Sequence, residues 1–237
     1  MDTRGNISQE KLAARRAYVQ QSPRSPVTVF HHIPKCGGTS VLDALANWFM
    51  MVPDYGSGWT GYYPKKLNTD SLRSAHCLCG HFELEGNHLH QRYPEVFTSN
   101  RFRVITFVRD PLQVKLSLFR YEKENNVLKT DVIEDHLLSR PNYIADRFPA
   151  TLDNYREIID RYFFVGILEK GQACLDNLAR VLDKPEVVMP WKNDTRKDNS
   201  TNMGNISSAF LERFREDNAL DYLIYDYCTE KFRQSSQ

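Results

Sequence analysis

The sequence predicts an α/β fold in three layers, with a central parallel sheet and helices on both of its faces. Short runs of β-branched and aromatic residues alternate along the chain with longer segments of helical period. There is no repeat of fixed length and no low-complexity block. The 237 residues are enough for one large domain with its own core. We therefore expect an N-terminal helical arm over residues 1–26 and a single domain over residues 27–237.

The first half of the chain contains the clearest strand–loop–helix pattern. A polar helix is expected over 8–21, and the prolines of 22–26 end it. The run VTVFHHI at 27–33 predicts a buried strand, and the apolar residues of 39–51 fall on one helical face. Further strands are expected over 75–82 and 102–108.

The second half continues the alternation. Each expected helix has an apolar stripe, and each expected strand is a short apolar run. Helices are expected over 112–124, 127–140, 152–160, 169–182 and from 206 onward, and strands over 162–167 and 186–189. The polar segment 191–205 is expected to be a loop.

Composition excludes several classes of protein. The chain has 31 Lys and Arg against 30 Asp and Glu, so a surface built for nucleic acid is not expected. No stretch approaches the ~20 apolar residues of a membrane span, and no secretory signal is visible. The 5 cysteines are irregularly spaced and predict reduced thiols. We expect a cytoplasmic protein, the alternative being a lumenal segment of an anchored Golgi protein.

The segment HIPKCGGTS lies between a predicted strand and a predicted helix. Gly37 and Gly38 allow a tight turn and a close approach of the backbone to a ligand. The helix that follows offers unpaired N–H groups, to which Thr39 and Ser40 add hydroxyls and Lys35 a positive charge. An ordinary helix cap would explain the glycines alone. Together these groups predict a site for a phosphate or a similar oxyanion.

The order of this loop differs from the Walker A motif, in which the lysine follows the glycines. Lys35 precedes them, which disfavours an ordinary ATPase or kinase.

A second candidate site follows the strand predicted over 102–108. Arg109 stands where that strand ends, at the edge where open α/β sheets bind ligands, and Ser117 comes two helical turns later. A guanidinium and a hydroxyl suit a dianionic phosphate. The alternative is a surface pair of Arg109 with Asp110, followed by a proline that opens a helix.

The segment HCLCGHF, residues 76–82, allows three interpretations. On a strand, Cys77, Cys79 and His81 would share one face, but the spacing lacks the paired C-x₂-C of structural zinc sites. The thiols could simply pack in a buried strand. His81 could also act as a general base, with His76 as the alternative, since a histidine titrates near neutral pH. His31 and His32 are expected to be structural.

These segments resemble those of sulfotransferases that use 3′-phosphoadenosine 5′-phosphosulfate (PAPS), most closely the carbohydrate branch with the heparan sulfate 2-O- and chondroitin sulfotransferases. HIPKCGGTS resembles their 5′-phosphosulfate loop, in which the lysine contacts the bridging oxygen of the donor. Cys36 replaces the more usual threonine. RDPLQVKLS resembles their 3′-phosphate motif, which implies that Arg109 and Ser117 hold that phosphate. Gly80-His81-Phe82 resembles the segment that supplies their base.

The resemblance covers roughly residues 27–200 and implies a P-loop-like sulfotransferase fold. The implied activity is PAPS-dependent sulfation of a hydroxyl, with adenosine 3′,5′-bisphosphate (PAP) as product, an oligosaccharide or glycoconjugate as acceptor, and no metal. Arg196 and Lys197 lie where family members close a lid over the nucleotide. The alternatives are a nucleotide kinase or NTPase of related fold and a non-catalytic nucleotide-binding module.

Overall fold

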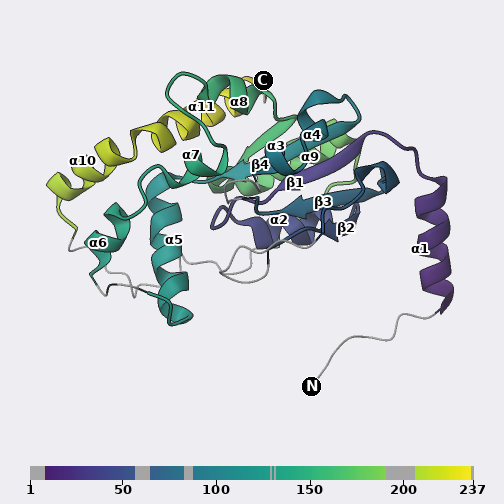
Figure 1. The fold of residues 1–237 in the computed structure, drawn as a ribbon, viewed down its shortest axis with the longest axis horizontal. Coiled ribbons are helices and arrows are strands. Elements are labelled where there is room, and N and C mark those ends of the chain that lie inside the picture. Colours follow the sequence, from purple (N-terminus) through teal and green to yellow (C-terminus); the bar gives the residue numbers. More distant parts are fainter. Residues whose placement is uncertain are drawn as a thin grey trace.

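The computed structural model describes residues 9–56, 65–82, 88–128, 130, 132–190 and 206–235. Within them, a five-stranded parallel sheet with the order β2–β3–β1–β4–β5 forms the centre of the fold (Figure 1). The strands are β1 (Val27–His31), β2 (Met50–Pro53), β3 (His76–Gly80), β4 (Phe102–Val108) and β5 (Phe164–Ile167).

The central strand β1 is buried along its whole length. It pairs with β3 on one side, where Thr28 faces Cys77, and with β4 on the other, where Val29 faces Val104. A parallel sheet needs cover on both faces, which explains why its strands are continuous apolar runs. Because the strands are parallel, the carboxyl ends of β1, β3 and β4 meet at one edge of the sheet.

Helices cover both faces of the sheet. In Figure 1, α4, α8 and α11 lie above it and α2 lies below it, which confirms the expected three-layer α/β architecture. The α-helices are α1 (Gln9–Gln21), α2 (Gly38–Leu45), α3 (Leu89–Arg92), α4 (Glu95–Thr98), α5 (Pro111–Glu124), α6 (Ile133–Leu138), α7 (Tyr143–Arg147), α8 (Tyr155–Asp160), α9 (Gly171–Leu182), α10 (Ser208–Asp217) and α11 (Ala219–Ser235). The described residues also contain the 3₁₀ helices η2 (Thr69–Ser71) and η3 (Leu168–Lys170).

The helix expected over 39–51 is shorter than predicted. It ends at Leu45, where the Asn47 side chain donates to the carbonyl oxygens of Asp43 and Ala44, at 2.9 and 3.1 Å. These bonds occupy acceptors that a further helical turn would have used. The apolar residues after the turn then form the edge strand β2.

Two other predicted helices are also shorter than expected. The expected helix 127–140 is confined to α6, because α5 ends at Glu124 and Asn126 takes a left-handed φ of 55°. The expected helix 152–160 begins only at Tyr155, since the Asn154 side chain accepts from the N–H of Thr151 at 2.7 Å and forms a turn there.

The strand expected over 186–189 does not join the sheet. The side chain of Gln172 in α9 forms hydrogen bonds to the backbone of this segment instead. Its Nε2 donates to the Val187 carbonyl oxygen at 3.1 Å, and its Oε1 accepts from the Met189 N–H at 2.8 Å. A side chain therefore replaces the strand partner. The short helices α3, α4 and α7 were not expected from the sequence.

The N-terminal helix α1 stands apart from the sheet in Figure 1, joined to β1 by a short extended segment. Among the described residues, every helix is too short or too polar to cross a bilayer.

Candidate active site

The loop after β1 turns sharply because of its two glycines. Gly37 has φ +75°, and a Cβ there would lie 2.3 Å from a Leu168 methyl group. A Cβ on Gly38 would lie 1.8 Å from Nε2 of His32. Larger residues therefore do not fit at either position. The loop delivers the chain directly into the first turn of α2, where Gly37 provides no side chain to cap the backbone N–H groups.

The other loop residues differ in their exposure. Thr39 is exposed, whereas Ser40 and Cys36 are buried. Burial raises the pKa of the Cys36 thiol, which therefore stays neutral. The Cys36 backbone N–H donates to the carbonyl oxygen of Ile33 at 3.3 Å. Thr39 is the hydroxyl of the loop that solvent reaches.

Lys35 and Arg109 come together at this loop. Arg109 Nη1 donates to the carbonyl oxygen of Lys35 at 3.3 Å, and Lys35 Nζ lies 4.2 Å from the centre of the Tyr121 ring. Burial, and secondarily the charge of Arg109, lowers the pKa of Lys35. Two partly buried cations next to a helix N-terminus attract an anion, since an anion would offset their repulsion.

The motif that contains Arg109 opens helix α5. The Asp110 carboxylate accepts from the N–H of Gln113 at 3.0 Å and Pro111 occupies the first turn, so Asp110 is a helix cap. Ser117 is buried on this helix. It precedes Tyr121 by four residues and therefore lies on the helix face that Tyr121 presents to Lys35.

His81 follows β3 directly and approaches the same loop. Its ring lies 4.5 Å from the ring of His32 and 4.8 Å from that of Tyr55, centre to centre. His32 in turn packs against Gly38. The His32 ring therefore contacts both Gly38 of the loop and the His81 ring.

The paired histidines at the end of β1 are uncharged. Burial lowers the pKa of both His31 and His32 to about 3. His32 Nδ1 is 3.0 Å from the Tyr55 hydroxyl, and His31 Nδ1 is 2.8 Å from the Tyr162 hydroxyl. Both support neighbouring groups, as the sequence predicts.

His76, the alternative base, lies at the amino end of β3, the opposite edge of the sheet from His81. Its Nδ1 accepts from the N–H of Arg73 at 2.9 Å. Cys77 and Cys79 are buried in the same strand, and burial raises the pKa of both thiols. In the described part of the chain, no three His, Cys, Asp or Glu side chains gather as metal ligands would.

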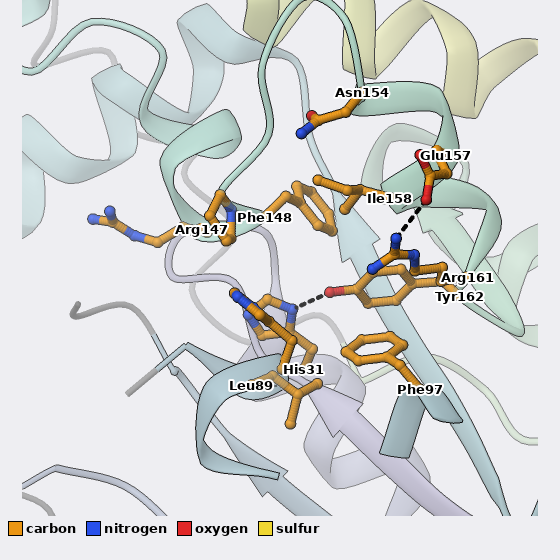
Figure 2. A pocket seen from close by; sticks show the side chains of 12 residues that line it. His31, Leu89, Phe97, Arg147, Phe148, Asn154, Glu157, Ile158, Arg161 and Tyr162 are labelled. Carbon is orange, nitrogen blue, oxygen red and sulfur yellow. Dashed lines mark hydrogen bonds and ion pairs between the residues drawn. The ribbon is translucent and has the colours of Figure 1, made fainter. Parts of the chain in front are cut away.

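A cavity of about 230 Å³ adjoins this site on the side of α8. Figure 2 shows the Tyr162 hydroxyl directed at the ring of His31, with Phe97 and Phe148 close to that pair. Arg161 and Glu157 form an ion pair at the upper right of that view.

Two predicted site residues, Arg196 and Lys197, lie outside the described residues. Conversely, sequence reasoning missed Tyr121 and underrated His32. Tyr121 could have been found from its four-residue spacing to Ser117. The contact of His32 with Gly38 has no sequence signal, because it depends on how the loop folds back over the strand end.

Comparison with known proteins identifies the fold. No family model and no curated protein matches the chain. Among solved structures, it is similar to a sulfotransferase from Alicyclobacillus acidocaldarius, with a TM-score of 0.52 and 12% identity over 86% of this chain and 94% of that one. A looser similarity links it to mouse sulfotransferase SULT7A1 complexed with PAP, with a TM-score of 0.49 and 13% identity over 94% and 95% of the two chains. The first similarity confirms the sulfotransferase fold.

Proposed function

We propose that this protein transfers a sulfuryl group from PAPS to a hydroxyl of a carbohydrate acceptor, an oligosaccharide or glycoconjugate. The observation that carries the proposal is the convergence of Lys35, Arg109 and His81 around one glycine loop on a sulfotransferase fold. The loop and the two cations suit a donor with several negative charges, and the histidine suits an acceptor hydroxyl. The carbohydrate acceptor rests on the resemblance of the motifs to the carbohydrate branch.

In this proposal the loop holds the 5′-phosphosulfate end of the donor. In it the backbone N–H groups of Gly37, Gly38 and the first turn of α2 bind the anion, with Cys36 as part of the loop, and Thr39 and Ser40 add hydroxyls. Leu168 and His32 fill the space that a Cβ would take at Gly37 and Gly38, so the loop needs glycine at both positions to keep this shape.

The 3′-phosphate of the donor is assigned to Arg109 and Ser117. The Arg109 guanidinium is partly buried, and within the described residues the hydrogen bond found for it is a long one, to the Lys35 carbonyl oxygen at 3.3 Å. A phosphate would make shorter, charge-assisted bonds to it. Arg196 and Lys197 are proposed to cover the nucleotide from the polar loop.

The transfer proceeds without a metal in this proposal. His81 accepts the proton of the acceptor hydroxyl, whose oxygen forms a bond to sulfur while the bond from sulfur to the phosphate oxygen breaks. Lys35 donates to that departing oxygen and offsets its developing charge. The products are a sulfated acceptor and PAP, and the proton remains on His81 until solvent removes it.

The alternative functions find less support in the site. A kinase or NTPase would need a carboxylate for Mg²⁺ after a strand, and the carboxylate of Asp110 is engaged as the cap of α5. A non-catalytic nucleotide-binding module would use the same loop and cations but would have no need of His81.

The deciding experiment incubates the protein with sulfur-labelled PAPS and a panel of hydroxyl acceptors that includes oligosaccharides, phenols and sterols. Transfer to an oligosaccharide supports the proposal in full, and transfer only to another acceptor overturns the carbohydrate class. PAP binding without any transfer favours the non-catalytic module. Phosphate transfer from ATP with Mg²⁺ favours the kinase.

Two further expectations belong to this proposal. We propose that residues 27–237 form a single sulfotransferase domain and residues 1–26 a helical arm, so removing the arm should leave turnover unchanged. The 5 cysteines are all free and buried, which suits a reducing compartment, and we propose that the protein works in the cytoplasm.

A further inference from the structure

Three hydrogen-bonding groups from separate segments form a chain behind the proposed base. The Tyr162 hydroxyl lies 2.8 Å from His31 Nδ1, and His31 Nε2 lies 3.1 Å from the backbone oxygen of His81 (Figure 2 shows the first contact). The first contact joins residues 131 positions apart in the sequence, and the second joins residues 50 positions apart. Only the fold brings them together.

The chemistry of the groups fixes the direction of both bonds. A carbonyl oxygen only accepts, so His31 Nε2 must carry the hydrogen. Burial lowers the pKa of His31 to about 3, so the ring is neutral and its Nδ1 is an acceptor. Burial also raises the pKa of Tyr162, which keeps its hydroxyl protonated as the donor. The sequence of donation is therefore Tyr162 to His31 to His81.

The His81 carbonyl is the first in this segment that lies beyond the backbone hydrogen bonds of the sheet. The parallel ladder between β1 and β3 ends where the N–H of His32 donates to the Gly80 oxygen at 2.9 Å. The next carbonyl is that of His81, and the chain then turns through Phe82, which has a left-handed φ of 50°. A side chain of β1 thus supplies the hydrogen bond that the backbone cannot.

The left-handed turn has a cost that its surroundings must offset, since a non-glycine residue is strained at positive φ. Phe82 is fully buried, and its ring packs 6.2 Å from that of His31 and 5.9 Å from that of Tyr93. His31 therefore contacts the turn twice, through the His81 oxygen and through the Phe82 ring.

We propose that His31, held in one tautomer by Tyr162, is a positioning residue that fixes the backbone of His81 and so aims its imidazole at the acceptor. The inference rests on the proposed function only in taking His81 as the base. His31 itself has both ring nitrogens engaged and does not exchange a proton with the acceptor.

The test uses three substitutions on the chain of hydrogen bonds and one control. His31→Leu removes the donor to His81, His31→Gln keeps an N–H donor at about the reach of Nε2, and Tyr162→Phe removes one hydroxyl. Tyr227→Phe is the control, because it removes a tyrosine hydroxyl that bonds the Asp160 carboxylate at 2.8 and 3.0 Å, and neither residue lines the cavity.

We expect His31→Leu and Tyr162→Phe to lower kcat ~3–10-fold, the loss typical of one hydrogen bond, with the Kd for PAP unchanged. His31→Gln should recover part of the loss, and Tyr227→Phe should match the wild type. In a His81→Ala background, His31→Leu should lower kcat no further, because the residue through which it acts is gone. A full additional loss in that background would overturn the proposal.

A second readout does not depend on turnover. Nitrogen NMR of the histidine rings should show His31 protonated on Nε2 alone, and His31→Leu should move the backbone resonances of His81. If the protein transfers no sulfuryl group to any acceptor, the proposed function fails. These spectra still test whether His31 fixes the backbone of His81. A His31 protonated on Nδ1, or His81 resonances unmoved by His31→Leu, would overturn it.

Discussion

The guanidinium of Arg109 donates to the carbonyl oxygen of Lys35 at 3.3 Å, across 74 positions of sequence. The two segments that carry the predicted anion-binding motifs therefore meet at one point, the carboxyl ends of β1 and β4. Because the contact is to a backbone oxygen, Arg109 also supports the loop from which Lys35 projects. Removing either side chain should affect the site in a different way.

Arg109→Ala should weaken the binding of adenosine 3′,5′-bisphosphate far more than that of adenosine 5′-phosphate. Arg109 is assigned to the 3′-phosphate, which only the first nucleotide carries. A lost charge-assisted hydrogen bond implies about 1.5–3 kcal/mol, which is at least about tenfold in Kd. Calorimetry measures both nucleotides. Arg103→Ala is the control, since Arg103 lies toward the other end of β4 with its guanidinium over Phe163. Equal losses for the two nucleotides would contradict the assignment.

Lys35→Ala should lower turnover more than donor affinity. The ammonium group is assigned to the oxygen that gains charge as the sulfur leaves it, and such an interaction acts mainly on the barrier. We expect kcat to fall ~10²-fold, by analogy with the loss of one oxyanion donor. Steady-state kinetics and PAP binding separate the two effects. Lys184→Ala is a matched control, because Lys184 Nζ also lies over a ring, that of Phe49, at 5.0 Å. An unchanged kcat with weaker donor binding would make Lys35 a binding residue only.

His81→Ala should abolish most turnover and leave PAP binding intact, since His81 belongs to the acceptor side. General-base catalysis contributes ~10²–10⁴-fold, so kcat should fall by that factor. The variant should also lose the rise of rate with pH that reports deprotonation of the base. His76→Ala, at the amino end of the same strand, should stay active. A fully active His81→Ala with an inactive His76→Ala would reverse the two roles.

The loop and the strand ends were predictable from the sequence because their signals are local. Gly37 and Gly38 follow a buried apolar run and precede a helical period, so strand, turn and helix can be assigned without knowing the rest of the chain. Arg109 directly follows the apolar run that predicts a strand over 102–108. The topology of parallel sheets then places both segments at one edge.

Contacts between distant segments could not be predicted in this way. The segment at 186–189 has the composition of a strand, but its backbone forms hydrogen bonds with the Gln172 side chain. No local sequence pattern predicts these bonds. The edge strand β2 was not predicted, because the apolar residues at its start also fit the helical period of α2. The pairing of Lys35 with Tyr121 depends on the rotation of α5 about its own axis.

Gly38→Ala should damage both stability and donor binding. The added methyl group would lie 1.8 Å from His32 Nε2, so the ring must move, and the His81 ring packs 4.5 Å from it. Overpacking of this kind costs about 1–3 kcal/mol. Chemical denaturation and PAP binding measure the two effects. In a His32→Ala background the overlap is gone, so Gly38→Ala should cost no further stability there. A single variant as stable as the wild type would show that the loop tolerates a side chain there.

The last prediction concerns acid stability and His31. Burial lowers its pKa to about 3, helped by the charges of His88, His81 and Arg147, against about 6.5 in the unfolded chain. Between these values the unfolded state binds a proton that the folded state does not. The free energy of unfolding should therefore fall as the pH drops below about 6.5, by about 1.4 kcal/mol per pH unit from this group.

His31→Gln cannot titrate, so its unfolding free energy should depend less steeply on pH than that of the wild type. Between pH 6.5 and 5, the difference in slope should correspond to about one proton taken up on unfolding. The comparison isolates His31 because the other groups remain in both proteins. Among them is Asp221, whose pKa burial raises to about 6; its folded form takes up a proton first, so it contributes the opposite slope. Urea unfolding at a series of pH values gives both curves. Parallel curves would mean that His31 is protonated as readily in the folded protein as in the unfolded chain, and that burial does not keep its ring neutral.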